Sequence, residues 1–220
     1  MLWDFYSVPT CFFTLYSLPG VSGSKIIDGV EAAPHSRPYM NILLTAAHCQ
    51  GERIIAQLGG HNFRTYEASR QDIAVSRMFP HEFYNSRNYR NDIMLLQLER
   101  NVMITPEVQP IKLSTDCADN LPGMPCSVAG WGRTFTGGPG SDVLREVDVT
   151  ILNICQYEQF NNLMWTVICG RANDCSQSSV GIVSLRNTAE CENPNREDVY
   201  TNICMFWPWI KMKFSAIAAE

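Results

Sequence analysis

Hydrophobic positions along the chain recur in short runs that turn residues interrupt. In residues 144–152 apolar and polar side chains alternate, and three apolar positions share one face: Val147, Val149 and Ile151. A period of two predicts a strand with one buried face. Three other apolar runs predict further strands, at 53–60, 71–79 and 91–98.

One segment follows a helical period instead. Phe206, Ile210 and Phe214 are four residues apart near the C-terminus, and Pro208 falls where the first turn of a helix tolerates it. Glycine and proline crowd residues 130–142, which predicts a loop between strands. Many short strands with a single terminal helix indicate an all-β domain, either a barrel or a sandwich.

Length and composition fit this interpretation. The chain has 220 residues, with 45% hydrophobic and 18% charged positions. This is enough for one all-β domain or two small packed halves with a sizeable core. The formal net charge of −5 argues against nucleic acid or an anionic membrane as a partner.

Nine cysteines, none in a Cys-x-x-Cys pair, favour disulfides in an oxidising compartment over free buried thiols. An apolar run at 11–18 is too short to span a bilayer, and small residues follow it. We therefore expect a signal peptide and a short activation peptide over residues 1–25. The first 24 residues contain no Lys or Arg, so an irregular leader is the alternative.

Two residues suggest acid–base chemistry. His48 lies among small residues in Leu-Thr-Ala-Ala-His-Cys, and imidazole titrates where it can take a proton from a hydroxyl. Asp92 precedes an apolar strand, where a carboxylate needs a partner such as a histidine N–H. The simpler alternative for Asp92 is a turn or capping residue.

These segments resemble the chymotrypsin-like serine proteases, and within them the granzyme and mast-cell protease branch. The similarity runs from Ile26 to Phe214, and its motifs occur in the family's order: KIIDGVEAAPHSRPYM, LTAAHC, NDIMLLQL, CSVAGWGRT, LREVDVTIL, GIVS, DVYTNI and FWPWI. The resemblance implies an activation cleavage between Lys25 and Ile26. It also implies that His48 is the general base and that Asp92 orients it.

The family fold is two packed six-stranded antiparallel β-barrels of the chymotrypsin type with a C-terminal helix. The active site lies in the cleft between them. The resemblance implies a protease domain at 26–220, with one barrel at about 26–115 and the second barrel plus helix at about 116–214. Two segments are missing from this pattern, so we expect both barrels to be incomplete.

The first missing segment is the loop that carries the nucleophile. The family's serine lies in Gly-Asp-Ser-Gly-Gly, and no such loop occurs between Cys169 and Gly181. Three serines remain there without the glycine-shaped turn: Ser176, Ser178 and Ser179. The paired N–H groups of that turn are lost too, and one such donor contributes about 3–4 kcal/mol to catalysis. We expect the chain to be inactive as written.

The second missing segment lies between Met40 and Ile42, where the family has a strand, a cysteine and a tight turn. Its loss removes the usual partner of Cys49. The family implies a Cys155–Cys169 bridge and a Cys126–Cys175 bridge. An alternative alignment pairs Cys175 with Cys191. The family's basic set leaves a further two cysteines unexplained: Cys117 and Cys204.

The resemblance also implies residues that bind substrate. Ser184 and Arg186 lie in the strand that binds the substrate backbone, and Arg186 replaces a glycine. Asp198 lies where a side chain can enter the primary pocket, which favours substrates with Lys or Arg; a solvated loop aspartate is the alternative. We expect peptide or protein substrates, secretion or storage in a granule, and no metal or cofactor.

Three functions compete: an active serine endopeptidase, a catalytically dead pseudoprotease that serves as a binding module or decoy, and an incomplete form of an ordinary protease. The absent nucleophile argues against the first. Loss of whole segments, with His48 and Asp92 kept, favours the third over the second.

Overall fold

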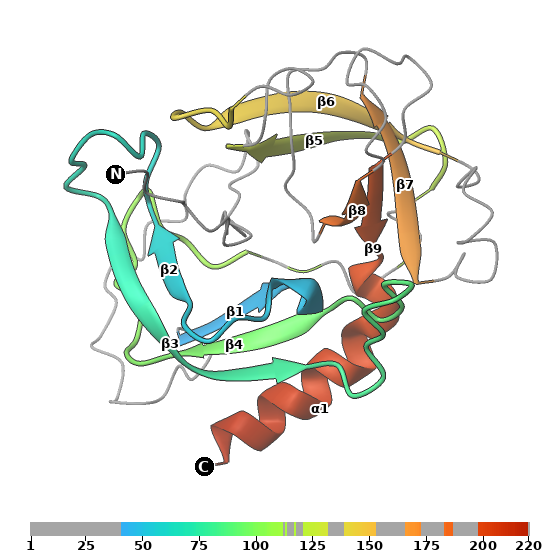
Figure 1. Cartoon of the computed structure of the whole chain (residues 1–220), viewed down its shortest axis with the longest axis horizontal. Helices are drawn as coiled ribbons and strands as arrows, with labels where there is room; N and C mark the ends of the chain where they lie inside the picture. The colour runs from blue at the N-terminus through green and yellow to red at the C-terminus, as the bar shows by residue number, and fades with distance from the viewer. Residues whose placement is uncertain are drawn as a thin grey trace, which may run out of the picture.

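The computed structural model describes most of the chain after residue 40. The described residues are 41–111, 113, 117, 121–131, 139–152, 166–172, 183–186 and 198–219. Within them the chain forms two antiparallel sheets and a C-terminal helix, as Figure 1 shows. No helix among these residues is long and apolar enough to cross a membrane.

The first sheet comes from the N-terminal half and has the order β1-β4-β3-β2. Its strands are β1 (Ile42–Thr45), β2 (Ile55–Leu58), β3 (Gln71–Pro80) and β4 (Met94–Leu98). Their inward side chains form one core, which includes Leu43, Ala56, Ile73 and Leu96. The three strands predicted in this half are confirmed, although β2 and β4 are shorter than their apolar runs.

Two strands of this sheet have a single neighbour. Among the described residues, β1 pairs with β4 and β2 pairs with β3, so β1 and β2 are both edge strands. A closed barrel has no edges. Residues 1–40 lie outside the described part of the chain, so the expected loss of a hairpin before β1 stays a prediction.

The second sheet has the order β5-β6-β7-β9-β8. Its strands are β5 (Pro125–Gly130), β6 (Arg145–Ile151), β7 (Val167–Ala172), β8 (Val183–Arg186) and β9 (Asp198–Thr201). The alternation predicted for β6 is confirmed at its end, where Val149 and Ile151 are buried and Thr150 is exposed.

The C-terminal helix α1 (Trp207–Ala218) follows a short 3-10 helix at Ile203–Phe206 and has a proline in its first turn, as predicted. It packs on the first sheet although it follows the second in sequence (Figure 1). The shared core includes Ile93, Leu95, Phe206, Trp209 and Ile210.

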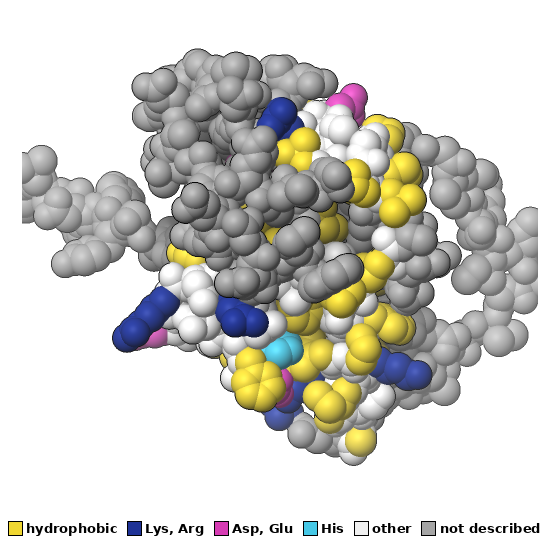
Figure 2. Space-filling view, turned by 90° about the vertical axis from the view of Figure 1, so that its right-hand side faces the viewer, with side chains coloured by type: hydrophobic (Ala, Val, Ile, Leu, Met, Phe, Trp, Pro, Cys, Tyr) yellow, Lys and Arg dark blue, Asp and Glu magenta, His cyan; other side chains and the backbone are white. Residues whose placement is uncertain are grey.

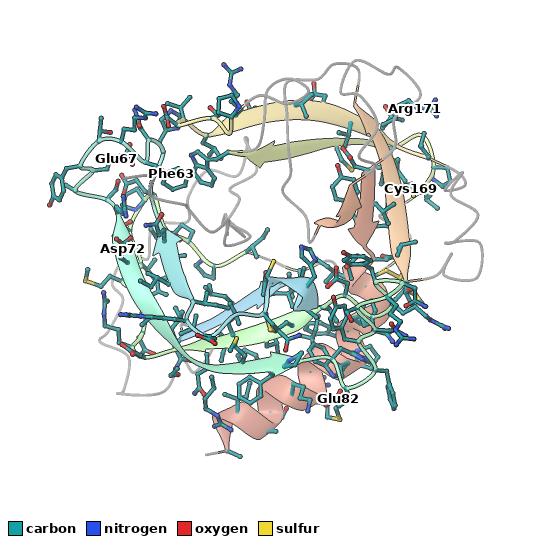
Figure 3. All side chains as sticks on the ribbon, in the orientation of Figure 1. Phe63, Glu67, Asp72, Glu82, Cys169 and Arg171 are labelled. Atoms are coloured by element: carbon teal, nitrogen blue, oxygen red, sulfur yellow. A yellow bond between two sulfur atoms is a disulfide. The ribbon has the colours of Figure 1, made fainter. Side chains whose placement is uncertain are left out.

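A carboxylate on the first half holds the polar side of this helix. Trp209 Nε1 donates a hydrogen bond to Glu82 Oε2 at 2.7 Å, and the ammonium of Lys213 pairs with the same carboxylate. Glu82 lies close to α1 in Figure 3. The hydrogen bond from Lys213, helped by that from Trp209, lowers the pKa of Glu82 from 4.5 to about 2.

The two halves are joined at a loop far from the helix. His61 and Phe63, between β2 and β3, exchange main-chain hydrogen bonds with Asp142 and Leu144. Trp131 Nε1 donates to the carbonyl of His61 at 2.9 Å, and its ring packs on Phe63. These contacts fix one end of the interface between the sheets.

The disulfides differ from the expected set. Cys117 and Cys204, which the family's basic set did not explain, form a disulfide across 87 residues. Cys49 is disulfide-bonded, although the sequence lacks the cysteine expected as its usual partner. Cys126 is a free, exposed thiol, so the predicted Cys126–Cys175 bridge is wrong for this structure. Cys126 is the second residue of β5, and Cys175 lies outside the described residues.

Candidate active site

His48 lies at the centre of a short 3-10 helix, Ala47–Cys49, that follows β1. Ala46 and Ala47 are buried, and each packs into one of the two cores of the first half. Only small side chains fit between these cores, so the turn is held tightly on both sides. The His48 side chain keeps 30% of its surface exposed.

The Asp92 carboxylate binds His48 twice. The main-chain N–H of His48 donates to Asp92 Oδ1 at 2.8 Å, and Nδ1 lies 2.7 Å from Asp92 Oδ2. The Asp92 side chain is only 1% exposed. A carboxylate accepts hydrogen bonds, so Nδ1 carries the proton and Nε2 has the lone pair. This is the tautomer that a general base requires.

On the face in Figure 2, hydrophobic side chains surround an exposed histidine side chain. Around His48, the Tyr89 ring approaches edge-on with the ring centroids 5.9 Å apart. Burial, with a contribution from the charge of Asp92, raises the pKa of Tyr84 to about 12. His48 therefore lies in a partly apolar surrounding next to the buried Asp92 carboxylate.

The turn that leads into Asp92 has an uncommon backbone. Tyr89 and Asn91 have φ angles of 55° and 54°, in the left-handed region that few non-glycine residues adopt. Asn91 Nδ2 donates to the carbonyl of Phe83 at 2.9 Å and ties the turn back on itself. Asp92 thus precedes β4 in a constrained turn and not in the strand itself.

The strands predicted to bind substrate lie side by side. Ser184 lies within β8, at an irregularity in its pairing with β9, and Arg186 lies directly opposite Asp198. Asp198, the first residue of β9, is half-buried. Its role in substrate binding stays a prediction.

Other predicted residues lie outside the described part of the chain: Lys25, Ile26, Cys155 and Cys175. Cys169, on β7 (Figure 3), is buried and disulfide-bonded. The segment where the family has its nucleophile is described only as far as Ala172. Among the described residues no cluster of three or more acidic, histidine or cysteine side chains could hold a metal.

Sequence reasoning missed one residue that touches this site. Thr201, the last residue of β9, donates from Oγ1 to the main-chain carbonyl of Asp92 at 2.8 Å. The available signal was its place two residues after Val199, on the face of β9 that is buried, because a buried hydroxyl needs a partner. The sequence pattern of β9 does not identify the acceptor, because the Asp92 carbonyl is 109 residues away in the chain.

Comparisons with known proteins agree with this geometry. The trypsin family model matches residues 26–210. Bovine duodenase-1 is 39% identical over 230 residues, covering 89% of this chain and 91% of the relative. Human granzyme H is 37% identical over 232 residues, covering 88% and 92%. A solved chain described as "Structure of GrC" is 31% identical with a TM-score of 0.70, covering 86% of this chain and all of that chain.

The family model matches most of the chain, and these relatives are similar over nearly their whole length. The structural neighbour extends the similarity to the arrangement of the strands and the helix. His48 and Asp92 occupy the order and the geometry that the motifs predicted. The chain therefore belongs to the trypsin family of chymotrypsin-like serine proteases, in the granzyme branch.

Proposed function

We propose that this chain is an incomplete and catalytically inactive form of a granzyme-like serine endopeptidase. The observation that carries the proposal is a formed His48–Asp92 pair in a sequence that has no Gly-Asp-Ser-Gly-Gly loop. The base and its orienting acid are kept, and the hydroxyl that they would activate is absent together with its oxyanion-binding turn.

In a complete form, the chemistry would be acyl transfer to serine. His48 Nε2 would take the proton from the serine hydroxyl as that oxygen attacks the peptide carbonyl, and would then protonate the leaving amine. Asp92 would hold the Nδ1–H tautomer and stabilise the imidazolium. Without a nucleophile, His48 has no proton to take and no acyl-enzyme forms.

A fluorophosphonate probe, which labels activated serines, tests this proposal directly. We expect the purified chain to remain unlabelled and to leave a broad panel of peptide substrates uncleaved, while an active granzyme is labelled in parallel. A His48→Ala variant is the matched control, because any cleavage that persists in it comes from a contaminant. Labelling of the chain that His48→Ala abolishes would contradict the proposal.

The transcript provides a second test. If this chain is an incomplete version, transcripts of the same gene should contain additional coding sequence between codons 40 and 41 and between codons 169 and 181. Deep sequencing across both junctions measures this. A single transcript that lacks both segments in every tissue would favour a genuine pseudoprotease.

One observation favours that pseudoprotease as the second candidate function. Cys49 is bonded and Cys117 is bridged to Cys204 although segments are missing, so the chain makes disulfides in its present form. A binding module or decoy needs such a stable fold. A single sharp thermal transition of the purified chain would favour the module, and a broad one would favour the incomplete enzyme.

We also propose that residues 1–25 are removed and that the protein is secreted or stored in a granule. Disulfides at Cys49, Cys117, Cys169 and Cys204 fit an oxidising compartment. N-terminal sequencing of the secreted chain should begin at Ile26. An intracellular chain that retains Lys25 would contradict this.

A preference for Lys or Arg substrates belongs to the complete form. Asp198, the first residue of β9, would attract the basic side chain of such a substrate. Its test is a peptide panel on a chain with the serine loop restored, and a preference for large apolar residues would contradict it.

A further inference from the structure

We propose that Thr201 is a positioning residue, which holds the catalytic aspartate from the opposite sheet. The proposal rests on the function proposed for His48 and Asp92 as base and orienting acid. Its observation is the hydrogen bond from Thr201 Oγ1 to the main-chain carbonyl of Asp92 at 2.8 Å. Both residues are buried, with 5% of Thr201 and 2% of Asp92 exposed.

This hydrogen bond crosses between the two halves of the molecule. Thr201 ends β9 in the second sheet, where it lies opposite Val167 of β7. Asp92 precedes β4 of the first sheet. The two sheets share no strand among the described residues. Other contacts described between the halves lie elsewhere: the loop at 61–64 contacts Trp131 and the segment at 142–144, and α1 packs on the first sheet.

Asp92 lies just outside the strand pairing of the first sheet. The pairing of β4 with its neighbours begins at Met94, two residues later. Before Asp92 the chain runs through the left-handed turn of Tyr89 and Asn91. The Thr201 hydroxyl gives the Asp92 carbonyl a hydrogen bond within the buried interface, where losing a partner is costly.

The position of Asp92 decides the position of the base. Its two carboxylate oxygens bind the N–H and the Nδ1 of His48, so a shift of the Asp92 main chain moves both contacts. Thr201 acts on His48 only through Asp92. Through this hydroxyl, a change in how the second sheet docks reaches the Asp92 main chain and, through Asp92, the orientation of the His48 imidazole.

Hydrogen exchange at the His48 amide tests the proposal on the full chain, because that N–H donates to Asp92 Oδ1. We expect Thr201→Val, which keeps the shape and removes the hydroxyl, to speed exchange about tenfold or more. Thr201→Ser should restore the wild-type rate. The matched control is Thr45→Val, which removes another buried hydroxyl three residues from His48.

A second readout separates positioning from general loss of stability. The Nδ1 proton of His48, shared with Asp92 Oδ2, should give a proton resonance well downfield of the backbone amides. We expect Thr201→Val to shift or broaden it, and Thr201→Ser and Thr45→Val to leave it in place. Exchange at the Val75 amide in β3, which donates to Ile54, should stay unchanged in all three variants.

Several outcomes would overturn the proposal: an unaltered His48 amide in Thr201→Val, failure of serine to rescue it, an equal effect of Thr45→Val, or complete exchange of the wild-type amide at the earliest time point. None of these readouts uses substrate or a nucleophile. Serine-probe labelling, which would contradict the proposed function, therefore leaves this test intact.

Discussion

Single residues near the site are constrained from several directions at once. Asp92 accepts hydrogen bonds at both carboxylate oxygens from His48 and at its carbonyl from Thr201. A buried carboxylate stays charged only with such partners. The motifs identified the pair, but the left-handed backbone of Tyr89 and Asn91 could not be predicted, because neither residue is a glycine.

The first prediction concerns Asn91, which has a φ of 54°. Asn91→Gly and Asn91→Ala both lose the hydrogen bond to Phe83, but only glycine adopts this backbone without strain. We expect the alanine variant to be less stable than the glycine variant by about 1 kcal/mol. Urea denaturation of the two variants measures the difference. Equal stabilities would show that the turn relaxes.

At the scale of elements, alternation and helical spacing predicted the strands and the helix, but not what each element touches. The runs at 53–60, 71–79 and 91–98 became β2, β3 and β4 because each buries one face in the same core. The packing of α1 on the first sheet could not be read from its own sequence, since it depends on Glu82, more than a hundred residues away.

The second prediction concerns pH and the docking of α1. The pKa of Glu82 falls from 4.5 to about 2 in the folded chain, so its contribution is complete above the unfolded value and is lost as pH falls toward 2. We expect Glu82→Gln to melt at a lower temperature than wild type at pH 6, with the gap closing between pH 4.5 and 2. A constant gap across that range would contradict the assigned pairing with Lys213.

At the scale of the whole molecule, the disulfides were the least predictable feature. The resemblance to the family predicted a disulfide at Cys126, yet that thiol is free. Cys117 instead forms a disulfide with Cys204, 87 residues away. Sequence order carries no information about which sulfurs meet when neighbouring segments are missing. The Cys117–Cys204 bridge links the segment between the two sheets to the start of the C-terminal helical region.

The third prediction follows from this bridge. In the chain-entropy model, a loop of this length stabilises the fold by roughly 4–5 kcal/mol, and measured effects are usually smaller. We expect the double variant Cys117→Ser, Cys204→Ser to lose about 2–4 kcal/mol of unfolding free energy. Cys126→Ser, which removes the free thiol, is the matched control and should change stability by less than about 0.5 kcal/mol. Equal losses in the two proteins would contradict the assigned bridge.

Among the described residues, β1 and β2 each have a strand on one side only, and this has a consequence for how a gene can vary such a fold. The four strands of the first sheet form one ladder, whose register shifts once, between Val75 and Arg77. A segment that contributes only outer strands can be spliced in or out as a unit, because its removal opens no gap inside the ladder. An exon inserted next to an edge strand would therefore leave the existing strand pairings unchanged.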